Sequence, residues 1–203
     1  MSLPIANLHL VPESVSTDAA TFTEPLAAAL EILDQINIES NHRVLVVGDG
    51  KLGLLVAQAI ATTGCEVLAI GRHEEKLRIL KDCGISVGFV DGIKPSSFDI
   101  AVECTGNPEG FAIALSALKA RGTLVLKSTY AGKLTIDASR IVVDEIKLVG
   151  SRCGPFAPAL ELLAAGKISV LPMIQARFDL QDGVRAIDRA AQKGTLKVLI
   201  DME

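Results

Sequence analysis

The 203-residue chain is poor in aromatic side chains and lacks any pattern of metal-binding residues. Aromatic residues make up 3% of the sequence and tryptophan is absent, although 49% of the residues are hydrophobic. The apolar content is therefore mainly valine, isoleucine, leucine and alanine, which is typical of parallel strands covered by helices on both faces. The four cysteines, Cys65, Cys83, Cys104 and Cys153, are widely spaced and match no Cys-x-x-Cys metal or redox pattern. We expect them to be buried free thiols.

The sequence also lacks a basic stripe, a long apolar run and a recognisable signal peptide. Its net charge is −4, with acidic and basic residues interspersed, which argues against nucleic acid as a partner. The apolar stretch around the first predicted strand is interrupted by Asp49 and Lys51, too early for a membrane span. The simplest interpretation is a cytoplasmic protein that binds neither nucleic acid nor a membrane.

From residue 43 onward, apolar strand patterns alternate with helical patterns and short glycine-containing joints. This alternation is typical of βαβ winding with right-handed crossovers, so we predict an α/β fold with a doubly wound, six-stranded parallel sheet in two mononucleotide-binding halves. The predicted strands cover 43–48, 66–70, 86–90, 98–104, 122–127 and 145–150, and the predicted helices cover 52–63, 73–83, 108–120 and 157–165.

The two ends of the chain do not follow this alternation of strands and helices. Ser16-Thr17-Asp18 offers N-cap residues for a helical stretch that runs to about residue 36, in two pieces that meet near Glu24-Pro25. After residue 168 we expect an extended segment at 171–174, a helix at 181–192 and a strand at 196–200. These elements do not continue the alternation of the main sheet, so we expect them to belong to another layer of the structure. We therefore divide the chain into segments 1–25, 26–168 and 169–203.

One sequence motif predicts a ligand-binding site. The stretch Gly48-Asp49-Gly50-Lys51-Leu52-Gly53 places a G-x-G-x-x-G pattern between a hydrophobic strand and an amphipathic helix. The first glycine allows a tight turn, the second lets the backbone approach a pyrophosphate, and the third permits close packing of helix and strand. The amides and the positive dipole end of the helix then face the phosphates. We predict a dinucleotide site here, with a structural glycine turn or a methyltransferase loop as the alternative.

The end of the second strand distinguishes NAD(H) from NADP(H). An NAD site usually carries Asp or Glu there, which accepts hydrogen bonds from the adenosine ribose. This sequence has Gly71, followed by Arg72 and His73. The glycine would leave room for a 2′-phosphate, Arg72 could pair with that phosphate, and Lys76 could add a positive charge. We favour NADP(H), the alternative being that Arg72 and Lys76 are solvated residues opening a surface helix.

The ends of the fourth and fifth strands supply further candidate residues. Cys104-Thr105-Gly106 follows one strand and Lys127-Ser128-Thr129 follows the other. Ligands of open parallel sheets bind beyond the carboxyl ends of the strands, so both stretches should flank the cofactor, mainly through their backbone. Cys104 has no histidine near it in the sequence, and we do not expect it to be a nucleophile.

Seven stretches together resemble a known family. They lie at 22–27, 48–53, 71–77, 102–106, 122–130, 148–154 and 194–199 and span nearly the whole chain. In these stretches the sequence is similar to the zinc-type medium-chain dehydrogenase/reductases, which include alcohol, polyol and threonine dehydrogenases.

The resemblance implies that most of an N-terminal GroES-like catalytic domain is missing from this sequence. That domain normally supplies the Cys and Gly-His-Glu motifs of the catalytic zinc and a four-cysteine structural zinc loop, and neither motif occurs here. Glu24 matches an acidic residue at or near the zinc in the polyol and threonine branch. One carboxylate cannot hold a catalytic zinc, which needs about three protein ligands, so zinc is expected only in a full-length relative. Segments 1–25 and 169–203 would then be remnants that normally pack on the catalytic domain.

Two further residue assignments follow from the resemblance. Lys197 stands where the family usually has an arginine that reaches the cofactor pyrophosphate, although a solvated strand lysine is the alternative. The strand at 145–150 matches the edge through which the family forms dimers, which predicts a homodimer.

The function implied by the resemblance is that of the cofactor-binding portion of an NADP(H)-dependent, zinc-type alcohol or polyol dehydrogenase. In a full-length relative, hydride passes between the nicotinamide and a small alcohol or carbonyl substrate. We expect this chain alone to be inactive. The alternative is a non-enzymatic dinucleotide-binding or sensing module derived from the same family.

Overall fold

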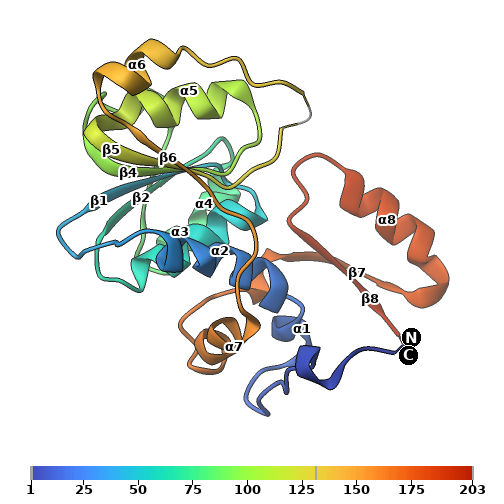
Figure 1. Cartoon of the computed structure of the whole chain (residues 1–203). Helices are drawn as coiled ribbons and strands as arrows, with labels where there is room; N and C mark the ends of the chain where they lie inside the picture. Colours follow the sequence, from blue (N-terminus) through green and yellow to red (C-terminus); the bar gives the residue numbers. More distant parts are fainter. Residues whose placement is uncertain (1, 131, 203) are drawn as a thin grey trace.

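The computed structural model describes residues 2–130 and 132–202, so that the outer limits of the predicted segments, residues 1 and 203, lie outside the described ranges. Its central element is a six-stranded sheet of order β3-β2-β1-β4-β5-β6 in which every neighbouring pair is parallel (Figure 1). This order confirms the predicted doubly wound sheet built from two halves. The strands are β1 (Arg43–Val47), β2 (Glu66–Ile70), β3 (Ser86–Gly88), β4 (Phe98–Glu103), β5 (Leu118–Leu126) and β6 (Lys147–Gly150).

Helices cover both faces of this sheet. Along β1, Val44 and Val46 pack into one hydrophobic core, while Leu45 and Val47 pack into the other. Both cores are buried, which explains why the central strands are apolar without alternation. Figure 1 shows α5 and α6 on one face and α2, α3 and α7 on the other. The helices are α1 (Thr17–Ala20), α2 (Thr23–Gln35), α3 (Lys51–Ala61), α4 (Glu74–Asp82), α5 (Pro108–Ala117), α6 (Ala138–Val143) and α7 (Phe156–Ala164).

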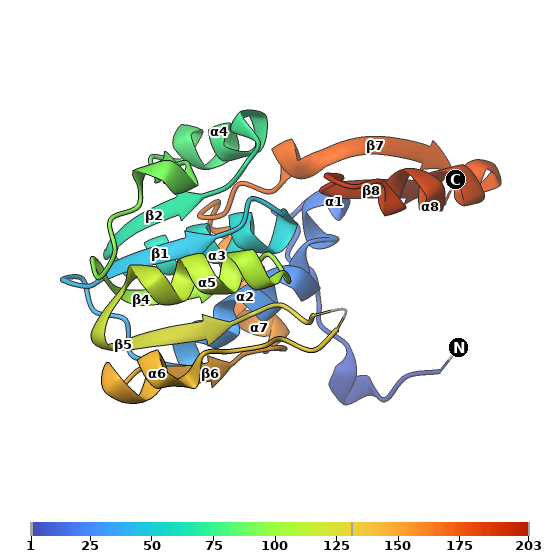
Figure 2. The same cartoon turned by 90° about the horizontal axis from the view of Figure 1, so that it is seen from above.

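The C-terminal part forms a second, small layer. Strands β7 (Ile174–Asp179) and β8 (Lys197–Asp201) pair in parallel and are connected through α8 (Gly183–Ala191). Figure 2 shows this unit projecting beyond the ends toward which the strands of the large sheet point. Four short 3-10 turns complete the description, at Ile5–Asn7, Val90–Gly92, Leu171–Met173 and Leu180–Asp182.

Several boundaries differ from the sequence prediction. The break between the first two helices precedes Glu24-Pro25, because α1 ends at Ala20 and α2 begins at Thr23. Pro25 lies in the first turn of α2, where a missing N–H removes no helical hydrogen bond. The segment predicted to be extended at 171–174 is a 3-10 turn, and the extended strand β7 follows it. Helix α6 was not predicted.

The largest difference concerns the end of α5. The sequence predicted a helix to residue 120 and a strand from residue 122, whereas the strand β5 already begins at Leu118. Leu118 is fully buried and pairs with Phe98 of β4, and this tertiary contact overrides the helix propensity of the following residues. The other predicted elements between 43 and 165 end within two residues of their prediction.

None of the helices formed by residues 2–130 and 132–202 combines the length and the apolar character needed to span a bilayer.

Candidate functional site

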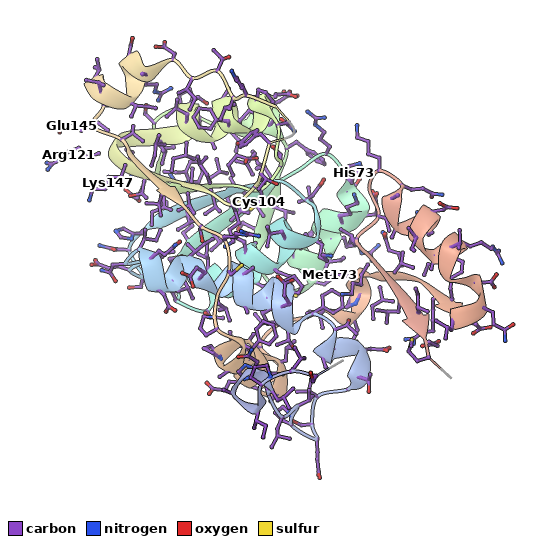
Figure 3. The ribbon with its side chains drawn as sticks, turned by 45° about the vertical axis from the view of Figure 1, so that its right-hand side comes forward. His73, Cys104, Arg121, Glu145, Lys147 and Met173 are labelled. Atoms are coloured by element: carbon purple, nitrogen blue, oxygen red, sulfur yellow. The ribbon has the colours of Figure 1, made fainter. Side chains whose placement is uncertain are left out.

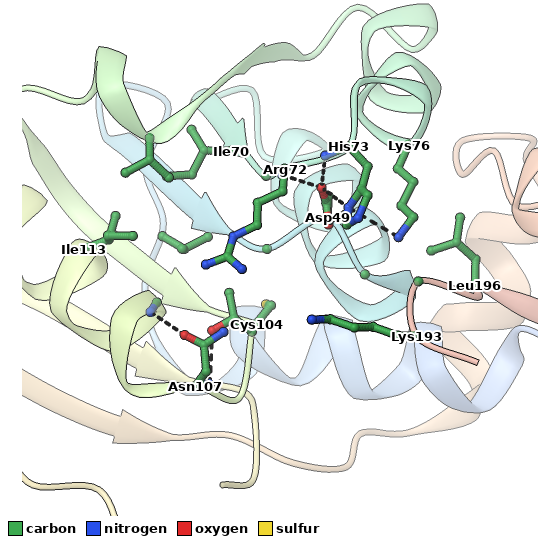
Figure 4. Close-up of a pocket in the computed structure, with 18 of the residues that line it drawn as sticks. Asp49, Ile70, Arg72, His73, Lys76, Cys104, Asn107, Ile113, Lys193 and Leu196 are labelled. Atoms are coloured by element: carbon green, nitrogen blue, oxygen red, sulfur yellow. Dashed lines mark hydrogen bonds and ion pairs between the residues drawn. The ribbon is translucent and has the colours of Figure 1, made fainter. Parts of the chain in front are cut away.

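The main candidate site is a cavity of about 260 Å³ at the carboxyl ends of β1, β2 and β4. The glycine-rich turn between β1 and α3 forms its floor, and the loop between α8 and β8 approaches it from the small second layer (Figure 4). The lining residues are Val47, Gly48, Asp49, Gly50, Ile70, Gly71, Arg72, His73, Lys76, Val90, Cys104, Thr105, Asn107, Gly110, Ile113, Lys193, Gly194, Thr195 and Leu196.

Different features of the structure explain why glycine stands at each of the three positions of the turn. Gly48 has φ of 123°, which side-chain-bearing residues rarely adopt, and a Cβ there would lie 3.1 Å from the carbonyl group of Cys104. A Cβ on Gly53 would lie 2.0 Å from the carbonyl oxygen of Gly48, so this glycine permits the contact between α3 and the turn. A Cβ on Gly50 would meet no atom within 4 Å. Gly50 therefore keeps open space in front of the turn.

Gly50 is also the N-cap of α3. It has an extended backbone, with φ of −73° and ψ of 169°, and provides no side-chain hydrogen bond to the first turn of the helix. The first-turn amides, which include those of Lys51 and Leu52, point along the helix axis toward its N-terminal end, where Gly50 lines the cavity although Lys51 and Leu52 do not. Such amides, together with the positive end of the helix dipole, attract anions.

Asp49 reaches from the glycine turn to the end of β2. Its Oδ2 atom accepts hydrogen bonds from the amides of Arg72 at 2.6 Å and His73 at 2.7 Å, and the His73 Nδ1 atom lies 3.0 Å away. Burial opposes ionisation, but the two amides and the His73 side chain outweigh it, so the pKa of Asp49 lies below its ordinary value. The carboxylate is thus ionised and firmly held at neutral pH.

The space beside Gly71 is therefore not empty. A Cβ on Gly71 would lie 2.4 Å from the Cβ and Oδ2 atoms of Asp49. The sequence led us to expect that Gly71 leaves room for a 2′-phosphate. This expectation is wrong, because the carboxylate of Asp49 fills the space next to the end of β2.

Four cationic or titratable side chains line this cavity, those of Arg72, His73, Lys76 and Lys193. Lys76 is only 5% exposed, and its Nζ atom lies 3.5 Å from Nδ1 of His73. No carboxylate lies within 4.0 Å of Nζ among the residues that the structure describes. Arg72 forms an exposed ion pair with Glu109, and Lys193 contributes from the loop after α8 (Figure 4).

The turn after β4 is held by a buried carboxylate. Glu103 is fully buried and accepts hydrogen bonds from the backbone and hydroxyl of Thr105, from the amide of Gly106 and, at 2.7 Å, from the Tyr130 hydroxyl. Burial, and then the hydrogen bond to Glu103, raise the pKa of Tyr130. Burial, followed by the charge of Glu103, likewise raises the pKa of Cys104. Cys104 is a neutral thiol in the cavity wall and not an activated nucleophile.

The stretch at the end of β5 lies in a neighbouring cavity. Lys127, Ser128 and Thr129 line a depression that they share with Ser151 and Arg152. Lys127 donates hydrogen bonds to the Ser151 hydroxyl at 2.8 Å and to the Arg152 carbonyl at 3.0 Å. Burial lowers the pKa of Lys127. The structure does not bring these three residues into the cavity above the glycine turn.

Lys197 and Glu24 lie on the side of the turn that faces α1 and α2. The Lys197 ammonium donates to the carbonyl of Thr21 at 2.8 Å and sits 5.0 Å from the centre of the Phe22 ring. Burial, and then the charge of Lys51, lower the pKa of Lys197. Lys197 is thus near the start of α3, as its assignment to the pyrophosphate requires, but it does not line the main cavity.

The donor set does not fit a catalytic zinc. Glu24 is exposed, and residues 2–130 and 132–202 contain no group of three or more His, Cys, Asp or Glu side chains able to hold a metal ion. A single carboxylate falls short of the roughly three protein ligands that such a zinc requires.

Sequence reasoning missed part of this site. Ile70, Val90 and Ile113 form its apolar walls, and Asn107 caps α5 by accepting the Gly110 amide at 2.8 Å. The Asn-Pro pair at the start of α5 is an N-cap signal that could have identified Asn107. Lys193 comes from another layer, and no local pattern points to it.

Comparison of the sequence with protein-family models identifies the family of this chain. The family model described as "Zinc-binding dehydrogenase" matches residues 52–165, more than half of the chain. The chain belongs to the zinc-binding dehydrogenase family. It is 25% identical to D-arabitol-phosphate dehydrogenase of Enterococcus avium over 217 aligned positions, which cover 96% of this chain and 60% of that protein.

Solved structures of proteins from this family are similar to the structure of this chain. An NADP-bound protein of Sinorhizobium meliloti 1021, described as a zinc-binding dehydrogenase, matches with a TM-score of 0.84 and 26% identity over 95% of this chain and 61% of its own. L-idonate 5-dehydrogenase of Escherichia coli str. K-12 substr. MG1655 matches with a TM-score of 0.85 and 26% identity over 94% and 59%. The chain therefore spans about 60% of the length of the relatives it matches.

Proposed function

We propose that this chain binds NADP(H) above the glycine turn and supplies the cofactor site of a zinc-type alcohol or polyol dehydrogenase. The observation that carries the proposal is the combination of an open Gly50, an uncapped start of α3 and a cavity at the carboxyl ends of β1, β2 and β4. A diphosphate fits this arrangement because backbone amides and a helix dipole can stabilise its charge without side chains in the way.

The remaining wall residues fit the adenosine half of a dinucleotide. Ile70, Val90 and Ile113 offer an apolar slot, which suits a flat adenine ring. The amides of the turn and of Lys51 and Leu52 would hold the diphosphate. When bound, the nicotinamide supplies hydride exchange with an alcohol or carbonyl carbon.

The preference for NADP(H) over NAD(H) is supported by the charge of the cavity rim. Lys76 is a buried ammonium without a neighbouring carboxylate among the described residues, and a buried charge is costly unless an opposite charge accompanies it. Arg72 and Lys193 line the same cavity, and Arg72 could exchange its exposed ion pair with Glu109 for a phosphate. All three positive charges would attract a 2′-phosphate.

Catalysis on a small alcohol or carbonyl belongs to the whole protein in this proposal. The names of the relatives, D-arabitol-phosphate dehydrogenase and L-idonate 5-dehydrogenase, support a polyol-like substrate class. The residues of this chain do not fit a zinc site, so we assign no step to zinc. Segment 26–168 would be the nucleotide-binding domain, with segments 1–25 and 169–203 packing on the catalytic domain.

We also propose that two copies of the chain pair through β6. This strand is an edge of the sheet, its Leu148 is 41% exposed, and Figure 3 shows Lys147 at this outer side of the molecule together with Arg121 and Glu145. An unpaired edge with an exposed apolar residue favours pairing across a two-fold axis. A cytoplasmic location is part of the same proposal, supported by four free cysteines in the described ranges.

Isothermal titration with NADPH and NADH tests the cofactor assignment. We expect wild-type protein to bind both and to bind NADPH more tightly. The variant Lys76→Met keeps the length of the side chain and removes its charge, and should reduce NADPH affinity by about tenfold while changing NADH affinity little. Lys81→Met, on the exposed side of the same helix, is the matched control and should change neither.

Two results would contradict this proposal. Failure of the wild-type chain to bind either dinucleotide would remove the function itself. Equal affinity of NADPH for wild type and Lys76→Met would remove the assignment of Lys76 to the 2′-phosphate.

A further inference from the structure

Asp49 occupies an unusual place for a residue of a glycine-rich turn. It lies between Gly48 and Gly50, yet its carboxylate is hydrogen-bonded to the residues that follow β2. The end of β2 is where an NAD site usually carries its ribose-binding carboxylate. In this chain β2 ends without a carboxylate of its own, and one arrives there from the neighbouring strand connection.

The geometry shows why β2 has glycine at this point. Any side chain at Gly71 would place its Cβ 2.4 Å from Asp49, well inside van der Waals contact. A carboxylate on Gly71 and the carboxylate of Asp49 therefore exclude each other sterically. The glycine is needed for Asp49, and its presence says nothing by itself about a 2′-phosphate.

The Asp49 carboxylate has acceptor capacity left for a ligand. Oδ2 takes the amides of Arg72 and His73, whereas the only recorded partner of Oδ1 among the described residues is Nδ1 of His73 at 3.2 Å. An ionised carboxylate offers about four lone-pair positions. Asp49 also lines the cavity (Figure 4), so a ligand hydroxyl could donate to it.

We propose that Asp49 is the specificity-determining residue that recognises the 2′ position of the adenosine ribose. This inference rests on the proposed dinucleotide function. The carboxylate accepts a hydrogen bond from the 2′-hydroxyl of NAD(H) and repels the 2′-phosphate of NADP(H). It thereby opposes the attraction of Arg72, Lys76 and Lys193, so the chain binds both cofactors and its preference for NADP(H) is small.

The decisive variant is Asp49→Asn, which keeps the size of the side chain and one oxygen acceptor while removing the charge. Asp99→Asn is the matched control. Asp99 also accepts a backbone amide, that of Arg43 at 2.9 Å, and it pairs with Lys119 at 2.7 Å. It lines a different cavity from Asp49.

Isothermal titration with NADPH and NADH measures the charge effect. Asp49→Asn should raise NADPH affinity about tenfold and lower NADH affinity several-fold, whereas Asp99→Asn should leave the ratio of the two affinities unchanged. An unchanged ratio in Asp49→Asn, with wild type binding a dinucleotide, overturns this inference and leaves the proposed function standing. No binding by wild type overturns both.

Titration with ADP and 2′-deoxy-ADP measures the hydroxyl contact. The wild-type protein should bind ADP several-fold more tightly than 2′-deoxy-ADP, and in Asp49→Asn this difference should shrink to less than about twofold. The wild-type comparison requires no variant, so the test stands even if Asp49→Asn does not fold. Equal affinity of wild type for the two nucleotides would show that Asp49 is only a structural link between the turn and β2.

Discussion

The substitution Gly50→Ala should separate an effect on cofactor binding from an effect on folding. An alanine fits the free protein, because the backbone has φ of −73° and ψ of 169° and the new Cβ meets no atom within 4 Å. A glycine-to-alanine change at a compatible position stabilises a protein by about 0.4–1 kcal/mol through the unfolded state. The poorer N-cap preference of alanine costs about 0.5–1 kcal/mol and offsets this gain. The free energy of unfolding should therefore change by less than about 1 kcal/mol.

The same methyl group would stand between the turn and a bound diphosphate. It would lengthen or remove one hydrogen bond from the amides at the start of α3. Hydrogen bonds to a charged group contribute about 1.5–3 kcal/mol each, so NADPH affinity should fall between about tenfold and about a hundredfold. Urea unfolding measures the stability, and isothermal titration with NADPH measures the affinity.

Gly183→Ala is the matched control for this experiment. Gly183 also has negative φ, −53°, and open space around its Cβ position, but it lies at the start of α8 and does not line the cavity. It should raise the free energy of unfolding by about 0.4–1 kcal/mol and leave the affinity for NADPH unchanged. If Gly50→Ala binds NADPH as tightly as wild type and Gly183→Ala, the diphosphate does not bind at this turn.

Four further outcomes are expected. Gly53→Ala should lose about 1–3 kcal/mol or more of stability, measured by urea unfolding, because its Cβ would overlap the turn carbonyl 2.0 Å away; wild-type stability would contradict this. The pKa of Asp49 is lowered by folding. The wild-type protein should therefore be more stable than Asp49→Asn at pH 7, and this advantage should be lost as the pH falls below about 4. If the difference in free energy of unfolding between the two proteins is the same at pH 7 and pH 3, folding does not lower this pKa. Leu148→Pro, at an edge position whose amide points away from β5, should convert a dimer into monomers in analytical ultracentrifugation while the fold is kept. Burial raises the pKa of Cys104, so iodoacetamide at pH 8 should label the exposed Cys83 and Cys153 well before it, as read by mass spectrometry.

The sequence predicted best what depends on neighbouring residues. The glycine turn, β1 and α3 follow one another within 19 residues of chain, from Arg43 to Ala61, and each has a local pattern that identifies it. Asn107 was missed, although the proline that follows it is a local sign of its capping role. The strand order β3-β2-β1-β4-β5-β6 was also predictable, because right-handed crossovers leave few alternatives.

What the sequence could not predict depends on contacts between distant residues. Helix α5 ends early because Leu118 pairs with Phe98, twenty residues before it in the chain. Lys193 reaches the cavity from the small C-terminal layer. Lys127 follows a strand end as expected, but its ammonium is satisfied by Ser151 and Arg152 in the adjacent depression.

The end of β2 shows why a single position is a poor guide to cofactor choice. Reading Gly71 as vacant space favoured a 2′-phosphate, yet Asp49 fills that space from a different connection. A bound 2′-phosphate would experience the summed field of all nearby charges, which here includes the carboxylates of Asp49 and of Glu109, the ion-pair partner of Arg72, together with Lys76, Arg72 and Lys193. Three positive charges then stand against two negative ones, so the proposed preference for NADP(H) should be small. Cofactor choice in this chain is therefore a property of the cavity and not of its strand-end residue.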